Sequence, residues 1–220
     1  MDTRMILTIA VLGGTGKEGR GLAYRWAKAG YHVIIGSRDP AKAQKAAGEV
    51  NARLGADTIV GLLNAEAAAA CDIAVLTVPY EAHRPTLEAM RSVLAGKVLV
   101  DVTVALNPGK IPSLVRPRAG SAAQEAQKIL GKKARVVSAF QNVSYVLLEA
   151  DEPIYSDVLV CGDDDEAKAQ VMRLAGAAGI NAWDAGPLAN SGTVEGLTPI
   201  LLWINSNHKM KGAGIRIVAD

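Results

Sequence analysis

Short runs of β-branched and aliphatic residues alternate along the chain with longer segments rich in alanine and other helix-forming residues. This alternation is typical of repeated β-α units, in which helices cover both faces of a parallel sheet. Most of the short runs are continuously apolar, as expected for strands that are buried on both faces. The pattern therefore predicts an α/β fold with a doubly wound, mostly parallel sheet.

The apolar runs predict strands over residues 5–12, 31–36, 58–62, 73–78, 98–102, 135–139, 158–161 and 181–184. The segments between them predict helices over residues 19–29, 40–54, 64–70, 81–94, 122–130, 166–178 and 193–205.

Two segments interrupt this rhythm. Residues 105–120 contain Pro108, Pro112 and Pro117 without a helical period, which predicts a long connection after the fifth strand, and long ordered loops are often functional. Residues 140–144 predict a short helical or irregular stretch before a more isolated β-α-β group. We therefore place a boundary between two parts, residues 1–139 and residues 140–220.

Composition and charge exclude several classes of function. The chain has 220 residues, with 24 Lys and Arg against 22 Asp and Glu, so the formal net charge is +2. This balance argues against a protein that binds nucleic acid or an anionic membrane surface. No run reaches the roughly 18 apolar residues of a membrane span, and the N-terminus lacks the pattern of a cleavable signal. We expect a protein of the cytoplasm that makes no contact with membranes.

The two cysteines, Cys71 and Cys161, lie in apolar runs and form no metal-ligand cluster. Three consecutive aspartates, at 163–165, stand where a strand meets a helix start, and there they suit the helix dipole and repel phosphate. We expect them to cap the helix. No metal site is predicted.

A glycine-rich motif follows the first predicted strand. Gly14, Gly16 and Gly19 form the pattern Gly-x-Gly-x-x-Gly at the start of a helix. In this setting the glycines permit a tight turn, let the backbone approach a pyrophosphate and let the helix pack close to the strand, while the helix N-terminus faces the anion. Thr15 lies inside the motif. The neighbouring Lys17 either contacts phosphate or faces water.

The end of the second predicted strand indicates which dinucleotide binds. An NAD-dependent enzyme carries an acidic residue here, but this chain has Ser37 and Arg38, with Lys42 one helical turn further on. An arginine can bind a phosphate with two charge-assisted hydrogen bonds, so this set favours NADP(H). Asp39 is expected to cap the helix that starts at Pro40. The alternative is that Arg38 and Lys42 only form a solvated basic surface.

Motifs for nucleophilic, metal-dependent or acid-base catalysis are missing. The sequence has no Gly-x-Ser-x-Gly, no His-Glu-x-x-His and no paired histidine and cysteine. His32, His83 and His208 are expected to be structural or solvated. We therefore predict no catalytic residue, and a direct hydride transfer between two bound cofactors is consistent with this absence.

Taken together, the motifs resemble those of the NADPH-dependent coenzyme F-420 reductases. The resemblance covers nearly the whole chain and rests on residues 12–16, 36–38, 71–79, 160–165 and 184–188. It implies an oxidoreductase of Rossmann type that exchanges hydride between NADP(H) and a deazaflavin co-substrate. The Rossmann domain would span residues 1–139, and a smaller C-terminal α/β lobe, residues 140–220, would complete the acceptor cleft. A cytoplasmic homodimer is also implied.

The resemblance also implies roles for individual residues. Those implied to hold NADP are Gly14, Thr15, Gly16, Ser37, Arg38 and Lys42, and those implied to lie near the cofactor rings are Thr77, Val78 and Pro79. On the deazaflavin side, Gln141 stands where archaeal members have a histidine, and Ser144 lies where they have a nearby proline. Gln141 and Asn142 are expected to donate amide hydrogen bonds to the acceptor.

Other functions stay open at this point. The chain can be an NADPH-dependent reductase of a flavin or another small acceptor, or a non-catalytic NADP-binding sensor. A similar module forms the NADPH oxidoreductase part of membrane metalloreductases, which pass hydride to flavin. The apolar segment 196–204 forms either a subunit interface or ordinary core packing.

Overall fold

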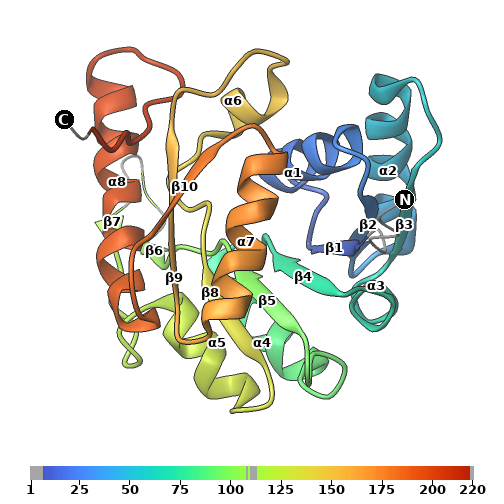
Figure 1. Cartoon of the computed structure of the whole chain (residues 1–220), viewed down its shortest axis with the longest axis horizontal. Helices are drawn as coiled ribbons and strands as arrows, with labels where there is room; N and C mark the ends of the chain where they lie inside the picture. The colour runs from blue at the N-terminus through green and yellow to red at the C-terminus, as the bar shows by residue number, and fades with distance from the viewer. Residues whose placement is uncertain (1–6, 108, 110–112, 219–220) are drawn as a thin grey trace.

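A computed structural model describes residues 7–107, 109 and 113–218 of the chain. Its centre is an eight-stranded sheet with the order β10-β9-β8-β5-β4-β1-β2-β3 (Figure 1). The strands are β1 (Thr8–Leu12), β2 (His32–Ser37), β3 (Ile59–Leu63), β4 (Ile73–Leu76), β5 (Val98–Asp101), β8 (Arg135–Ser138), β9 (Asp157–Gly162) and β10 (Asn181–Asp184).

Strands β1 to β5 and β8 are parallel, and β9 pairs antiparallel with β8. The chain builds outward from β1 through β2 to β3 and then crosses back to β4, on the other side of β1. This reversal opens a crevice at the carboxyl ends of β1 and β4, where doubly wound sheets bind their ligands. The Rossmann-type α/β prediction is confirmed.

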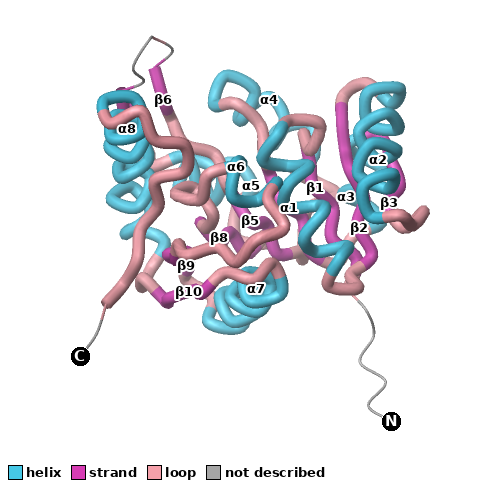
Figure 2. Tube along the Cα trace, turned by 90° about the horizontal axis from the view of Figure 1, so that it is seen from above, coloured by secondary structure: helices cyan, strands magenta, loops and turns pink. Residues whose placement is uncertain are grey.

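Helices cover both faces of the sheet (Figures 1 and 2). They are α1 (Lys17–Lys28), α2 (Pro40–Leu54), α3 (Asn64–Ala70), α4 (Tyr80–Met90), α5 (Ala122–Leu130), α6 (Tyr145–Glu149), α7 (Asp165–Ala177), the 3-10 helix η1 (Leu188–Asn190) and α8 (Ser191–Asn207). Side chains of α1, α2, α6 and α7 share one buried cluster, and those of α3, α4 and α5 share another. Each central strand contributes to both clusters: in β1, Ile9 and Val11 belong to the first, Ala10 and Leu12 to the second.

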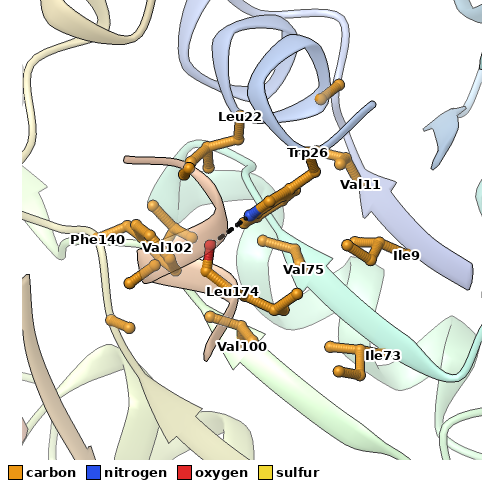
Figure 3. Close-up of a cluster of buried hydrophobic side chains, with 14 of the residues drawn as sticks. Ile9, Val11, Leu22, Trp26, Ile73, Val75, Val100, Val102, Phe140 and Leu174 are labelled. Carbon is orange, nitrogen blue, oxygen red and sulfur yellow. Dashed lines mark hydrogen bonds between the residues drawn. The ribbon is translucent and has the colours of Figure 1, made fainter. Parts of the chain in front are cut away.

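Trp26 lies at the centre of the larger cluster (Figure 3). Its ring meets the ring of Phe140 edge to face, with 5.8 Å between the centroids, and its indole nitrogen donates a 2.8 Å hydrogen bond to the carbonyl oxygen of Leu174 in α7. The core therefore joins α1, α7 and the segment that follows β8.

A second link between these parts is made by Arg25 of α1. Its guanidinium donates to the carbonyl oxygens of Leu147 and Leu148 at 2.9 and 3.1 Å, and to that of Ala178 at 3.0 Å. Because these carbonyls belong to α6 and to the end of α7, one side chain holds three helices in a fixed relation.

All eight predicted strands are confirmed, and their ends differ by at most two residues among those described. Residues 5 and 6 of the first predicted strand lie outside the described residues. The predicted helix over residues 81–94 ends as α4 at Met90 and continues as turns. The long connection after β5 is present and contains an unpredicted antiparallel pair, β6 (Leu106–Asn107) and β7 (Ser113–Leu114). Pro108 and Pro112 of that connection lie outside the described residues.

The β-α-β group after residue 140 is less isolated than its sequence suggests, because β9 and β10 extend the main sheet beyond β8. The division into residues 1–139 and 140–220 stays a prediction.

Candidate active site

The glycine-rich motif forms the turn between β1 and α1. Gly13 has a φ of 69°, in the left-handed region that favours glycine, and a Cβ there would lie 2.3 Å from the Val78 side chain. The Gly13 amide donates to the Asn64 side chain at 3.0 Å, and the Gly14 amide donates to the carbonyl of Gly36 at 3.0 Å. The turn is therefore anchored to its neighbours on both sides.

Two glycines of the motif have opposite surroundings. A Cβ on Gly19 would lie 2.6 Å from the Cα of Gly14 and 2.9 Å from the Thr77 hydroxyl, so Gly19 allows α1 to pack against the loop. A Cβ on Gly16 would meet nothing within 4 Å. The space beside Gly16 at the start of α1 is open, as an approaching pyrophosphate requires.

Cations gather beside the end of β2. Ser37 is buried and its hydroxyl accepts from the Asp39 amide at 3.2 Å, while Arg38 and Lys42 are exposed. Asp39 caps α2 as predicted, accepting from the amides of Ala41 and Lys42 at 3.0 and 3.3 Å. Its carboxylate is thus held on the helix end.

A cavity of about 240 Å³ lies between the glycine-rich turn and α2. Thr15 and Lys42 line it together with Lys45, which the sequence analysis did not select. Lys45 lies three residues after Lys42 on the same helix, so helical spacing was the available signal for it.

The ends of β4 and β5 form the floor of the crevice. The Thr77 hydroxyl donates to the carbonyl of Leu12 at 3.2 Å, and the Thr103 hydroxyl donates to the carbonyl of Val78 at 3.3 Å. Thr77, Val78 and Pro79 are thereby held beside the glycine-rich turn, at the position expected for residues near the cofactor rings.

Beneath this floor lies a buried ion pair. His83 and Asp101 are fully buried, and His83 Nε2 lies 2.7 Å from Asp101 Oδ2. Burial alone lowers the pKa of His83, but the Asp101 carboxylate raises it above its ordinary value overall. His83 is held in place by a buried carboxylate, and its structural role stays a prediction.

A second group of polar residues follows β8. Phe140 has a φ of 72°, an uncommon conformation for a bulky residue, and its packing against Trp26 holds it there. The backbone bend places Gln141 and Asn142, both buried, directly after it.

Both amide groups point their nitrogens into the protein. Gln141 Nε2 donates to the Asp101 carbonyl and to the Ser138 hydroxyl, each at 2.8 Å. Asn142 Nδ2 donates to the Val194 carbonyl and to the Thr198 hydroxyl, each at 3.1 Å. A carbonyl oxygen can only accept, so each amide has one consistent orientation.

Both side-chain oxygens, Gln141 Oε1 and Asn142 Oδ1, are buried without a partner among the described residues. The expectation that these amides donate to an acceptor molecule is therefore wrong. Their donors are used internally, and their free groups are hydrogen-bond acceptors.

These residues line a cavity of about 550 Å³. Its wall is completed by α6 and α8, by the tail after α8, and by Glu18 from the first turn of α1. Burial raises the pKa of the Glu18 carboxyl to about 8, so it carries its proton at neutral pH. Glu18 was missed by the sequence analysis, because nothing in a glycine-rich motif signals which of its variable positions is buried.

The site thus consists of two regions that meet at α1. We call the first the dinucleotide side, formed by the glycine-rich turn, the cations after β2 and the loop after β4. We call the second the acceptor side, formed by the large cavity. Glu18 lies two residues after Gly16, and its neighbour Lys17 reaches the Tyr145 hydroxyl at 3.4 Å, so the start of α1 belongs to both regions.

The remaining sequence predictions concern structural residues. Asp164 caps α7 by accepting from the Ala167 amide at 2.8 Å, and Asp163 accepts from the Leu188 amide at 2.8 Å. Cys71 and Cys161 are free and buried. Within residues 7–107, 109 and 113–218, no cluster of metal-ligating side chains is present, and no helix is long and apolar enough to cross a bilayer.

Comparison with solved structures supports the fold. A putative F420-dependent NADP reductase from Arthrobacter sp. FB24 superimposes with a TM-score of 0.84 at 26% identity, covering 97% of this chain and all of the other. A pyrroline-5-carboxylate reductase from Coxiella burnetii, at 16% identity and a TM-score of 0.63, shares the fold.

Comparison of sequences gives the family. Residues 8–105 match the model of the family described as NADP oxidoreductase, coenzyme F420-dependent. The F420-dependent NADP reductase of Methanocaldococcus jannaschii is 43% identical, covering 96% of this chain and 98% of that protein. The F420-dependent NADP reductase of Methanothermobacter thermautotrophicus is 42% identical, covering 97% of this chain and 95% of that protein. A more distant match is rat metalloreductase STEAP3, which is 31% identical over 86% of this chain and 36% of that protein. With relatives this similar along almost its whole length, the chain belongs to the family of coenzyme F420-dependent NADP reductases.

Proposed function

We propose that this protein catalyses direct hydride transfer between NADP(H) and the deazaflavin coenzyme F420. The observation that carries the proposal is the meeting of two sites at the start of α1, one built for a phosphorylated dinucleotide and one a cavity with unpartnered buried acceptors. Family membership supports the same reaction.

On the dinucleotide side, the backbone amides of α1 and the basic side chains after β2 fit the phosphate groups of NADP(H). The open space beside Gly16 leaves the first amides of α1 free to bind the diphosphate. Arg38 and Lys42, with Thr15 and Ser37 nearby, would hold the ribose 2′-phosphate, and Lys45 adds a third cation. When bound, the dinucleotide supplies a hydride at its nicotinamide ring.

The acceptor side fits a flat, polar ring. The free oxygens of Gln141 and Asn142 can each accept from a ring or ribityl N–H or O–H group, whereas Val143, Leu201 and Met210 supply apolar wall. These residues would orient the acceptor and exclude water. The protein thereby aligns two rings, which is the main requirement of a hydride transfer.

The reaction is tested by mixing the purified protein with NADPH and oxidised coenzyme F420 and following the deazaflavin absorbance. We expect bleaching that requires both the protein and NADPH, with little turnover when FMN or FAD replaces the deazaflavin. Turnover with FMN or FAD alone would instead support a flavin reductase. Tight NADPH binding without turnover of any acceptor would support a sensor.

We further propose that the protein is a homodimer that pairs through α8. Ile200, Leu202 and Trp203 of this helix are all exposed, at 54%, 38% and 51%, although a helix that is apolar on most sides is normally covered. In Figure 1 this helix lies at the end of the molecule opposite α2 and β3. Its exposed side is accessible to a second copy.

Light scattering of the protein and of Trp203→Glu tests this pairing. We expect twice the chain mass for the wild type and the chain mass for the variant. The matched control is Val60→Glu, which places the same charge on an equally exposed apolar residue of β3. A monomeric wild type, or dissociation by the control only, would contradict the assignment.

A cytoplasmic location is the remaining part of the proposal. Its support is the pair of free, buried cysteines, which suits a reducing compartment. Fractionation of the source cells with an antibody against the chain tests it.

A further inference from the structure

The first turn of α1 places a carboxyl group where the two binding regions meet. Glu18 is the second residue of α1, two positions after Gly16 of the glycine-rich motif, and its side chain lines the acceptor cavity. Its Oε1 atom is buried and has no hydrogen-bond partner among the described residues. A buried acid without a partner is costly to the fold, and such groups concentrate at functional sites.

The surroundings of Glu18 keep the group neutral. The other titratable side chains that line the cavity are Tyr145 from α6 and Lys211 from the tail after α8, and Lys17 is the neighbour of Glu18 in α1. Lys17 is directed to Tyr145, with its ammonium 4.6 Å from the ring centre, and no ion pair joins Glu18 to any residue that the structure describes. Because no ion pair with a described residue stabilises the carboxylate, burial raises the pKa of Glu18 to about 8 and the acid keeps its proton at neutral pH.

The other unpartnered buried groups that line the cavity are hydrogen-bond acceptors. The unpartnered oxygens of Gln141 and Asn142 have no proton to give, since all four N–H groups of these amides donate within the protein. Among the carboxyl groups of the described residues, Glu18 is the one that lines this cavity. An acid whose pKa lies near the working pH is the group best able to give and regain a proton.

We propose that Glu18 is the proton donor to the acceptor ring when NADPH is oxidised, and the proton acceptor in the reverse direction. The inference rests on the proposed function, and it revises the prediction that no protein group takes part in the chemistry. It assigns the role to a variable position of the glycine-rich motif.

The stoichiometry of the hydride transfer requires a proton donor. Oxidation of NADPH breaks one C–H bond of the nicotinamide ring, and the hydrogen leaves with both electrons to form a new C–H bond on the acceptor ring. The nicotinamide is oxidised and the acceptor reduced by two electrons, and one proton is then needed at an acceptor ring nitrogen. The O–H bond of Glu18 breaks as the N–H bond forms, and the Glu18 carboxylate regains a proton from water.

Glu18→Gln is the direct test, because glutamine keeps the size and the hydrogen-bonding capacity of the acid but cannot release a proton. We expect kcat for deazaflavin reduction near neutral pH to fall about 100-fold, in the range typical of general acid catalysis. The KM for NADPH should stay within a factor of about two. The wild-type kcat should decline above about pH 8, and this decline should be absent from the variant.

Infrared difference spectra of the protein without substrates give a readout that is independent of activity. A protonated carboxyl band should disappear with a midpoint near pH 8 in the wild type and be absent from Glu18→Gln. Glu195→Gln is the matched control, because Glu195 is a buried carboxyl outside the cavity whose pKa burial raises to about 7. That variant should lose a separate band and keep both the Glu18 band and the rate.

Three results would overturn the inference while leaving the proposed function intact. They are an unchanged rate and pH profile in Glu18→Gln, a Glu18 carboxyl that is ionised at pH 7 in the infrared titration, and an effect confined to the KM for NADPH. The third would assign Glu18 to anchoring the dinucleotide. Absence of any deazaflavin bleaching by the wild type would overturn both. A solvent deuterium isotope effect on wild-type kcat tests the same step if the variant folds poorly.

Discussion

The dinucleotide side and the acceptor side of the site consist of different kinds of chemical group. The first uses backbone amides, glycines and exposed cations, which stand close together in the sequence. The second uses the buried amides of Gln141 and Asn142 and the half-buried Glu18, with further lining from α6, from α8 and from the tail. Exposed cations attract a charged ligand, whereas unpaired neutral groups select a ring by shape and hydrogen bonding.

This difference indicates how each side is altered by mutation. Contacts of the dinucleotide side act on affinity and on the choice between phosphorylated and unphosphorylated coenzyme. Contacts of the acceptor side act on orientation and on proton balance. Variants on one side should therefore leave the parameters of the other nearly unchanged, and each experiment below tests that separation.

The largest effect is expected from Gly19→Ala. The new Cβ would overlap the Cα of Gly14, so the glycine-rich turn has to move away from α1. Several amide contacts to the diphosphate would be lost together, each worth roughly 1.5–3 kcal/mol, and we expect NADPH affinity measured by calorimetry to fall at least about 100-fold. Gly48→Ala on α2, where a Cβ meets nothing within 4 Å, is the control and should bind normally. Normal NADPH binding by Gly19→Ala would contradict the close packing of Gly19 against Gly14.

Arg38→Ala should have the next largest effect, and it should be selective. Removing one charge-assisted phosphate contact costs about 1.5–3 kcal/mol, which corresponds to a loss of NADPH affinity of roughly 10- to 150-fold. The affinity for NADH should hardly change, because NADH has no 2′-phosphate. Titration of both coenzymes gives the ratio, and equal losses for the two would contradict the assignment of Arg38.

Glu18 on the acceptor side and Glu195 outside the cavity predict a dependence of stability on pH. In the unfolded chain Glu18 and Glu195 release their protons near 4.5, but in the folded chain they hold them to about pH 8 and 7. Between these values the folded state binds more protons, so rising pH favours unfolding. We expect the free energy of unfolding to fall from pH 5 to pH 8, by at most about 1.4 kcal/mol per pH unit for each group.

Urea denaturation at several pH values measures this slope. Glu18→Gln and Glu195→Gln should each flatten it, whereas Glu88→Gln, at an exposed position, should not. A slope of the opposite sign would mean that these carboxyls are ionised in the folded protein.

The smallest effect is expected from Gln141→Leu. This change removes the side-chain acceptor together with the two donors to Asp101 and Ser138. Loss of one neutral hydrogen-bond acceptor, worth about 0.5–1.5 kcal/mol, should raise the KM for the deazaflavin by roughly 2- to 12-fold. The KM for NADPH should stay constant. Gln141→Glu also gives up both donors but keeps an acceptor, so it should lose thermal stability as the leucine variant does and show a smaller rise in the KM for the deazaflavin. A rise in the KM for NADPH alone in Gln141→Leu would contradict the assignment of Gln141 to the acceptor side.

The same contrast explains what could be predicted from the sequence. The strands, the turn at Gly14 and Gly16, and the cap at Asp39 depend on nearby residues, so local patterns were sufficient for them. The fold followed from the order of these elements.

The acceptor side depends on contacts between distant residues. The orientation of Gln141 is set by Asp101, forty residues earlier, and that of Asn142 by Val194 and Thr198, more than fifty residues later. No local pattern shows that these partners use up the amide donors, nor that one oxygen of Glu18 is buried. The sequence therefore selected Gln141 and Asn142, which line the cavity, but not the direction of their hydrogen bonds.

Arg25 gives the two sides a mechanical connection. It lies two turns along α1 from the glycine-rich turn and binds the carbonyls of Leu147 and Leu148 in the helix that supplies Tyr145 to the acceptor cavity. The guanidinium thereby sets the spacing between the start of the dinucleotide side and the wall of the acceptor cavity. Because its partners in α6 are backbone carbonyls, substitution of the side chains of Leu147 and Leu148 removes none of these acceptors.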